Sequence, residues 1–329
     1  MFQKRSRATV IPDGVIENLQ QAIDVLAEIE SDSDFRYTDR RQGIQDRFPV
    51  GIWFRGQSRN WELKPKVFRT RPNQLHDEGN LFAHCQIRLP DYHNRCRTKF
   101  DWLCLMQHYA VPSRLLDWSE SLLIALYFAV SEGDQDKNAQ LIALNARRLN
   151  SHAYRTWVPD EYGLFIPSSI EVIVRAEMAA KHSRSALIAT LFGGESGSPE
   201  VALRAKLELS GLTPELEKKG GGLLANLNLR NPIAVVPNRI NERMVFQSSA
   251  FTLHGGKMYL GSEKTEKKDR LEPPVSLEEI NQKDKILKYY EIPRKRIVPI
   301  REQLFKLGIH EGSLFPEIDK QGSYLCQLW

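Results

Sequence analysis

Residues 101–131 constrain the fold more than any other stretch, because they contain a helix that must be buried on all sides. The segment Ser119–Val130 has the sequence SESLLIALYFAV and is apolar on nearly every face, which is typical of a helix in a protein interior. Ala125 and Ala129 lie four residues apart, so another backbone can approach that side of the helix closely. We therefore expect the rest of the chain to pack around this helix.

A shorter helix and an extended segment precede the buried helix. Asp101–Tyr109 carries apolar side chains at helical spacing. The proline that follows ends this helix, since the residue before a proline is pushed towards extended geometry. Residues 113–118 are then predicted to be extended. The buried helix can be opened by Asp117 with Glu120, as an acidic form of the capping box, or by Ser119.

Four polar residues sit within this apolar surrounding: His108, Arg114, Asp117 and Ser119. A buried polar group without a partner costs about 1–3 kcal/mol, so these side chains form either a structural network or a site. For Arg114 two interpretations remain open. It can form an ion pair with Asp117 that ties the extended segment to the helix, or it can contact a ligand.

The remaining pattern predicts an α+β fold, because the predicted strands come from distant parts of the chain. Val50–Phe54 is rich in aromatic and β-branched residues, which indicates a buried strand, and Gly56 is expected to allow a tight bend at its end. The other predicted strands are Gln140–Leu144, Ile233–Val236 and Met244–Leu253, and the last two are expected to be neighbours. Helices are predicted over Glu17–Ile29, over Asn80–Lys99 with a break at Pro90, and over Leu277–Lys288. The last of these helices leads into a basic turn at Pro293–Arg296.

Composition narrows the class of protein. The 329 residues can hold one large domain or two ordinary ones. There is no run of about 18 apolar residues to span a membrane, and the basic N-terminus lacks the apolar stretch of a secretory signal. The four cysteines form no CxxC pair, and His84, Cys85, His93 and Cys96 match no usual zinc spacing. We expect a cytoplasmic protein with reduced thiols and no membrane or metal partner.

Phe54–Gln57 (FRGQ) is one distinctive motif, and Gln107–Ser119 (QHYAVPSRLLDWS) is a second. Together these two motifs resemble the FRG-domain family. Shorter matches follow at Arg243–Gln247 and Gly308–Pro316. The resemblance implies this organisation: an N-terminal helix and linker at residues 1–48, and an FRG domain at residues 49–329 with a more helical insertion at about 150–230.

Three segments follow one another along the chain: Arg55-Gly56, Asp117–Ser119 and Glu242–Phe251. More distantly, they resemble the three strand-borne elements that mono-ADP-ribosyltransferases carry in this order, with Met244 where the catalytic glutamate would fall. The similarity implies an ADP-ribosyltransferase-like mixed sheet with flanking helices and a pocket for NAD. Methionine cannot align the ribose or support charge at the nicotinamide bond, so catalysis is left open.

Arg55 is the first candidate for contact with a ligand. A guanidinium offers a planar fork to phosphate, and the neighbouring glycine lets a ligand come near. The alternative is a buried arginine paired with Asp117 or another carboxylate. Gln247 lies on the same face of the predicted late strand as Arg243. It is placed either to bind a base or nicotinamide amide, or to satisfy backbone groups of the sheet.

Two residues are candidates for proton transfer. His108 is suited to general acid–base catalysis at neutral pH, or it is a hydrogen-bonded core histidine. Glu311 can replace the missing glutamate, or it is an exposed turn residue. The full set of candidates is Arg55, His108 and Glu311 for catalysis, and Arg55, Gln57, Arg114, Asp117, Ser119, Arg243 and Gln247 for binding NAD or a related nucleotide.

These resemblances imply an enzyme that transfers ADP-ribose to a macromolecule or hydrolyses NAD, of the kind that acts as a bacterial toxin or a phage-defence effector. The sequence does not define the macromolecular target. The alternative is a non-catalytic module of the same fold that binds a nucleotide or a partner protein. A nucleic-acid partner is the third class; it is indicated only by the modest net charge of +5 and the basic run Arg294–Arg296, and it predicts salt-dependent binding.

Overall fold

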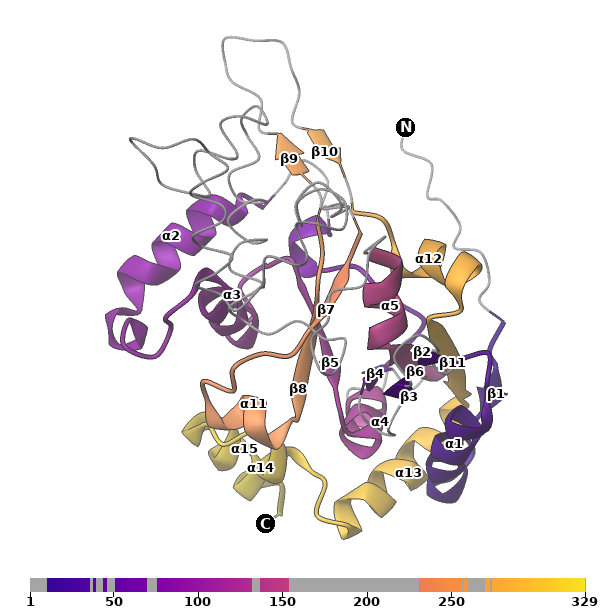
Figure 1. Ribbon diagram of the computed structural model, residues 1–329. Coiled ribbons are helices and arrows are strands. Elements are labelled where there is room, and N and C mark those ends of the chain that lie inside the picture. The colour runs from indigo at the N-terminus through magenta and orange to yellow at the C-terminus, as the bar shows by residue number, and fades with distance from the viewer. Residues whose placement is uncertain are drawn as a thin grey trace, which may run out of the picture.

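The centre of the molecule is a seven-stranded sheet in the order β1-β11-β6-β4-β5-β8-β7, with helices on both faces (Figure 1). The computed structural model describes residues 11–35, 38–39, 44–45, 51–69, 76–131, 137–153, 231–255, 257–259, 270–272 and 274–328. Neighbouring strands of the sheet are antiparallel except β1 and β11, so the sheet is mixed. The strands are β1 Gly14–Val15, β4 Ile52–Gln57, β5 Leu115–Ser119, β6 Ala139–Asn145, β7 Ile233–Val235, β8 Ser249–Leu253 and β11 Leu287–Ile292, and two short ribbons pair β2 Thr38–Asp39 with β3 Ile44–Gln45 and β9 Lys257–Tyr259 with β10 Arg270–Glu272.

The predicted α+β class, with a mixed sheet and flanking helices, is confirmed. The helical insertion predicted at about 150–230 falls almost wholly on residues 154–230, which lie outside the described residues. The helices are α1 Leu19–Ser31, α2 Glu78–Arg88, α3 Lys99–His108, α4 Leu122–Ser131, α5 Ala146–Ala153, α11 Glu242–Phe246, α12 Leu277–Asp284, α13 Arg294–Lys306, α14 Glu311–Leu314 and α15 Ile318–Leu328, with single 3₁₀ turns η1 Lys66–Phe68 and η2 Pro90–Tyr92.

Apolar side chains on the two faces of the sheet form separate cores. On one face, β4, β6 and β11 pack against α1, α4 and α13. On the other face, side chains of β4, β5, β6, β8 and β11 pack against α5 and α12. The residues of β5, β8 and β7 that point away from that second core pack against α2 and α3. The sheet is therefore the middle layer of the fold.

The predicted burial of the central helix is confirmed in α4, which packs on β4 with little space between the two backbones. A Cβ atom placed on Gly56 of β4 would come within 1.8 Å of the Ala125 carbonyl oxygen and 2.4 Å of the Ala129 amide nitrogen. The predicted bend at Gly56 is wrong, because β4 continues through it to Gln57. The glycine is needed for the close approach of α4, on the side that Ala125 and Ala129 were expected to leave open.

The start of α4 also differs from the prediction. Ser119 ends β5, and its hydroxyl oxygen accepts a hydrogen bond from the Ser121 amide at 3.1 Å. Ser121 then accepts a hydrogen bond from the Ile124 amide at 3.4 Å. The predicted capping box of Asp117 and Glu120 is therefore wrong, since Asp117 is a strand residue.

Sequence patterns near the C-terminus were misassigned in two places. The helix predicted over Leu277–Lys288 ends at Asp284, because Lys285 takes a left-handed conformation with φ of 48° and ends the helix. The following residues form β11. The basic turn predicted at Pro293–Arg296 is instead the start of α13, with Pro293 at the N-cap.

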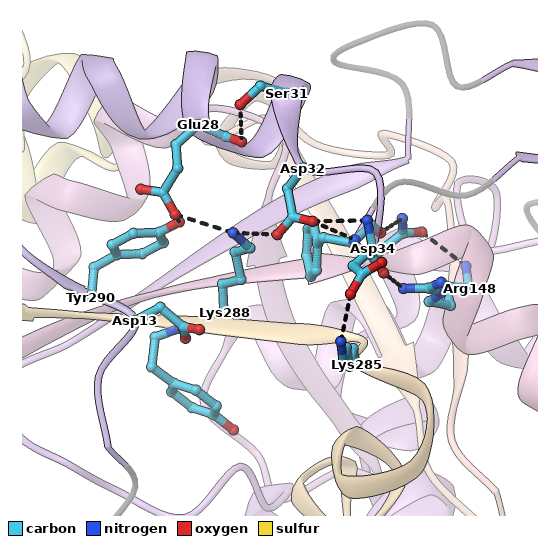
Figure 2. A network of polar contacts seen from close by, with 12 residues as sticks. Asp13, Glu28, Ser31, Asp32, Asp34, Arg148, Lys285, Lys288 and Tyr290 are labelled. Carbon is cyan, nitrogen blue, oxygen red and sulfur yellow. Dashed lines mark hydrogen bonds and ion pairs between the residues drawn. The ribbon is translucent and has the colours of Figure 1, made fainter.

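A polar network centred on Lys288 ties α1 to β11 (Figure 2). The ammonium group of Lys288 lies 2.7 Å from the Asp32 carboxylate and 3.1 Å from that of Glu28, and the Tyr290 hydroxyl donates to Glu28 at 3.0 Å. Burial opposes the charge on Lys288, but hydrogen bonds to Asp32 and Glu28 outweigh it and raise its pKa above the usual value. The network holds α1 against the sheet.

Candidate functional site

A cleft of about 670 Å³ opens between β4 and β5. These strands are joined by one residue pair, Phe54 with Ser119, whereas β4 pairs with β6 over six residues and β5 with β8 over five. Beyond that pair the two strands separate, and side chains from β4, β5, α4 and α11 line the space. The cleft thus joins early, middle and late parts of the chain.

Arg55 of β4 is the central cation of the cleft. Its Nη1 donates to the Asp117 carbonyl oxygen at 2.6 Å and lies 3.9 Å from the Asp117 carboxylate. The side chain is 18% exposed, and no acceptor among the described residues reaches its buried Nε. Burial lowers the pKa of Arg55 to about 10, with Asp117 opposing and Arg69 adding to the shift. The guanidinium is charged at neutral pH, with unmet hydrogen-bonding capacity.

Cations outnumber carboxylates around the cleft. Among the described residues that line it, the cationic side chains are Arg55, Lys64, Arg69 and Arg243, and the carboxylates are Glu62 and Asp117. Burial lowers the pKa of Arg69, with Asp117 and Glu62 opposing the shift. Such a surplus in a partly enclosed space favours an anionic ligand.

Asp117 is the carboxylate that the cleft holds most firmly. Gln107 of α3 donates from Nε2 to Asp117 Oδ2 at 2.7 Å, and the Ser113 hydroxyl donates to Gln107 Oε1 at 2.8 Å. The Asp117 side chain is nevertheless 53% exposed. A ligand in the cleft can therefore reach a carboxylate whose orientation is already fixed.

The far side of the cleft is formed by α11 and its C-cap. The Ser119 hydroxyl donates to the Gln247 carbonyl oxygen at 2.8 Å, and Gln247 Nε2 donates to the Leu314 carbonyl oxygen at 3.1 Å. On the β4 side, Gln57 is buried, and its Oε1 has no hydrogen-bond donor among the described residues. Arg243 lies one turn before Gln247 and also lines the cleft.

Comparison with known protein families identifies the domain to which β4, β5 and α4 belong. The family model for the FRG domain matches residues 51–138. The chain carries an FRG domain. No curated protein and no solved structure matches the chain. None of the described helices is long and apolar enough to cross a membrane, and the described residues contain no group of three or more His, Cys, Asp or Glu side chains that could hold a metal ion.

The matched FRG domain contains β4, β5 and α4, so it supplies both strands that border the cleft and most of the residues that line it. Six of the predicted site residues meet in that cleft, and four of them belong to the matched region. The six are Arg55, Gln57, Asp117 and Ser119 within the FRG match, and Arg243 and Gln247 from α11 beyond it.

Three predicted site residues do not line the cleft. Arg114 is paired with Glu78 at 2.6 Å, with both side chains buried, so the predicted ion pair with Asp117 is wrong. His108 lies 3.2 Å from a Glu317 oxygen, and burial lowers its pKa, with Arg243 adding to the shift and Glu317 opposing it. Glu311 pairs with Lys320 at 3.4 Å.

The late strand predicted at Met244–Leu253 begins only at Ser249, and its first part belongs to helix α11. Asn241 caps this helix by accepting a hydrogen bond from the Met244 amide at 2.9 Å. Met244 is buried in the core with α3, so it does not occupy a strand position facing a ligand. Arg243 and Gln247 share one side of a helix rather than one face of a strand.

The predicted site residues leave out several residues that line the cleft, including Glu62. Lys64 and Arg69 lie in the irregular segment after β4, Trp61 is half exposed at the same place, and Gln107 comes from the end of α3. Gln107 begins the second FRG motif, so its position in that motif was a signal that could have been used. Trp61 and Arg69 follow the first FRG motif and belong to the same resemblance, whereas no pattern marks Lys64.

Proposed function

We propose that the cleft of the FRG domain binds NAD or a closely related phosphate-bearing nucleotide. The observation that carries the proposal is the Arg55 guanidinium, which is charged, mostly buried and left with an unpartnered Nε among the described residues. A phosphate group offsets such a charge and accepts its hydrogen bonds. The volume of about 670 Å³ suits a small-molecule ligand, and half-exposed Trp61 offers a base an aromatic surface.

Arg55→Ala tests this function. A hydrogen bond to a charged group is worth about 1.5–3 kcal/mol, so the dissociation constant for NAD or ADP-ribose should rise by about 10- to 150-fold. Isothermal titration calorimetry measures the constants, and nucleotide-dependent thermal stabilisation provides a second readout. The same nucleotides without phosphate, nicotinamide riboside and adenosine, should bind equally weakly to the wild-type protein and the variant.

Arg239→Ala is the matched control, because Arg239 pairs with Glu120 on the surface at 2.6 Å and does not line the cleft. Its affinity for NAD should equal that of the wild type. If neither NAD, ADP-ribose nor AMP stabilises the wild-type protein at millimolar concentration, the cleft is not a nucleotide site.

A second candidate function, hydrolysis of NAD or transfer of its ADP-ribose, is favoured by the position of Asp117. In hydrolysis, the bond between ribose C1′ and the nicotinamide nitrogen breaks, and nicotinamide leaves with the bonding electrons. The oxygen of a water molecule bonds to C1′ while its proton passes to a base. Asp117 is exposed to the cleft and held by Gln107, so it can accept that proton or face the positive charge that develops on the ribose.

Asp117→Asn should therefore reduce nicotinamide release by about 10²- to 10⁴-fold while leaving NAD affinity within about threefold, since asparagine keeps an oxygen for Gln107. Release is followed by chromatography, with Glu62→Gln as the control at the other cleft carboxylate. Wild-type protein that binds NAD without releasing nicotinamide would instead be a non-catalytic binding module.

A further inference from the structure

The C-terminal segment Leu314–Glu317 contacts two residues of the cleft, Arg243 of α11 and Gln247 at its C-cap. Gln247 Nε2 donates to the Leu314 carbonyl oxygen at 3.1 Å. The Arg243 guanidinium lies 4.5 Å from the centre of the Phe315 ring, and that ring meets Phe128 of the cleft edge-on at 6.1 Å. A segment outside the matched FRG region therefore reaches the wall of the cleft.

Within this segment, the Glu317 carboxylate forms an ion pair with Arg243, one of the cations of the cleft. Its Oε1 is 3.4 Å from Arg243 Nη1 and 3.2 Å from His108 Nε2. Burial and the charge of Arg243 lower the pKa of His108 even though Glu317 opposes the shift, so at neutral pH the positive charge facing Glu317 is that of Arg243. The other oxygen, Oε2, is buried without a hydrogen-bond donor among the described residues.

This contact is weaker than the one a phosphate can make. The Arg243 and Glu317 side chains are 27% and 26% exposed, and the contact of 3.4 Å is longer than a strong charge-assisted hydrogen bond. A phosphate oxygen can approach a guanidinium more closely and engage two of its N–H groups. Glu317 also leaves one of its own oxygens unsatisfied, which disfavours its present position.

We propose that Arg243 is a second phosphate-binding position of the cleft, and that Glu317 occupies it as an internal anion which the phosphate of a bound nucleotide displaces. The proposal rests on the nucleotide-binding function argued above. It assigns the C-terminal segment a role in setting affinity: the chain's own carboxylate competes with the ligand for one arginine. Removing the charge of Glu317 should therefore tighten binding, whereas removing Arg243 should weaken it.

The competition between Glu317 and the ligand phosphate is tested by titrating four proteins with ADP-ribose in a calorimeter. The four are the wild type, Glu317→Gln, Arg243→Ala and the double variant. Partly exposed ion pairs are weak, and releasing one corresponds to roughly a two- to fivefold change in an equilibrium constant. Glu317→Gln should lower the dissociation constant by that factor, and the gain should be absent when Arg243 is alanine. Glu120→Gln, at the surface pair with Arg239, should leave the constant unchanged.

The outcomes separate this inference from the proposed function. An unchanged or higher constant in Glu317→Gln, with wild-type binding intact, overturns the inference alone. A gain that persists in the Arg243→Ala background overturns it too, since the carboxylate would then act through the general field. Absence of binding in all four proteins overturns both. Melting temperatures confirm that the variants are folded, and Glu317→Ala, which should show the same gain, replaces Glu317→Gln if that variant is unstable.

Discussion

Gly56→Ala is expected to remove a large part of the stability of the protein, which for an ordinary domain is about 5–15 kcal/mol. The added methyl group would lie 1.8 Å from the Ala125 carbonyl oxygen and 2.4 Å from the Ala129 amide nitrogen. Both are backbone atoms of α4, so no side-chain rotation relieves the contact, and β4 must separate from α4 along the middle of the core. Overpacking usually costs about 1–3 kcal/mol; a clash of two backbones should exceed that, with a loss of at least about 4 kcal/mol.

Urea denaturation followed by circular dichroism measures this loss of stability. The control is Gly322→Ala in α15, where an added Cβ would have no neighbour within 4 Å and alanine favours the helix by about 1 kcal/mol over glycine. That variant should be as stable as the wild type or slightly more stable. A folded Gly56→Ala protein with an unchanged midpoint would show that α4 does not rest on β4.

Glu78→Gln should destabilise the protein by about 3–5 kcal/mol, because it removes the counter-charge of a buried arginine. The Arg114 and Glu78 side chains are only 7% and 4% exposed, with 2.6 Å between Nη2 and Oε2. The same carboxylate accepts the Arg114 Nε at 2.7 Å and its backbone amide at 2.8 Å. In the variant, the Arg114 charge would remain inside the core without the Glu78 carboxylate.

The control for this prediction is Glu120→Gln, at a surface pair with Arg239 in which both side chains are about 40% exposed. Surface pairs contribute at most about 1 kcal/mol, so its free energy of unfolding should change little. Replacing both buried partners, as Glu78→Leu with Arg114→Met, should recover much of the loss. Equal stability of Glu78→Gln and Glu120→Gln would contradict the buried pair.

The central helix and its surroundings could be predicted from sequence because their signal is strong and local. The apolar run that forms α4 allows no exposed face, and Ala125 with Ala129 correctly indicated which side another backbone approaches. The short helix before it and the extended segment that became β5 were also predicted correctly. These elements needed no knowledge of distant contacts.

The errors arose where tertiary contacts outweigh local preference. Residues 242–253 are rich in apolar residues and favour a strand, yet the Asn241 cap converts the first five into α11. The motif offers Asp117, three residues away, as one partner for Arg114, whereas Glu78, with which Arg114 pairs, lies 36 residues earlier on α2. A partner on another helix cannot be found from spacing within one motif.

The cleft could be predicted in outline but not in full. Arg55 and Asp117 belong to motifs, and their carbonyl–guanidinium contact confirms that they lie together. Lys64 and Arg69 depend on the path of an irregular segment, which no periodicity encodes. Arg243 and Gln247 lie near each other despite the wrong secondary structure, because residues four apart share a side of a helix just as alternate residues share a face of a strand.

The single residue pair between β4 and β5 has a mechanical consequence. Two strands of a sheet are harder to separate when more residue pairs join them. Here β4 and β5 are joined by the single pair Phe54 and Ser119, whereas β4 and β6 share six pairs and β5 and β8 share five. The sheet should therefore separate most easily between β4 and β5, with its two parts rotating about the pair Phe54 and Ser119. The hydrogen bond from Arg55 to the Asp117 carbonyl oxygen links the two strands across the cleft. A ligand that draws the guanidinium away from this carbonyl would therefore change the distance between β4 and β5.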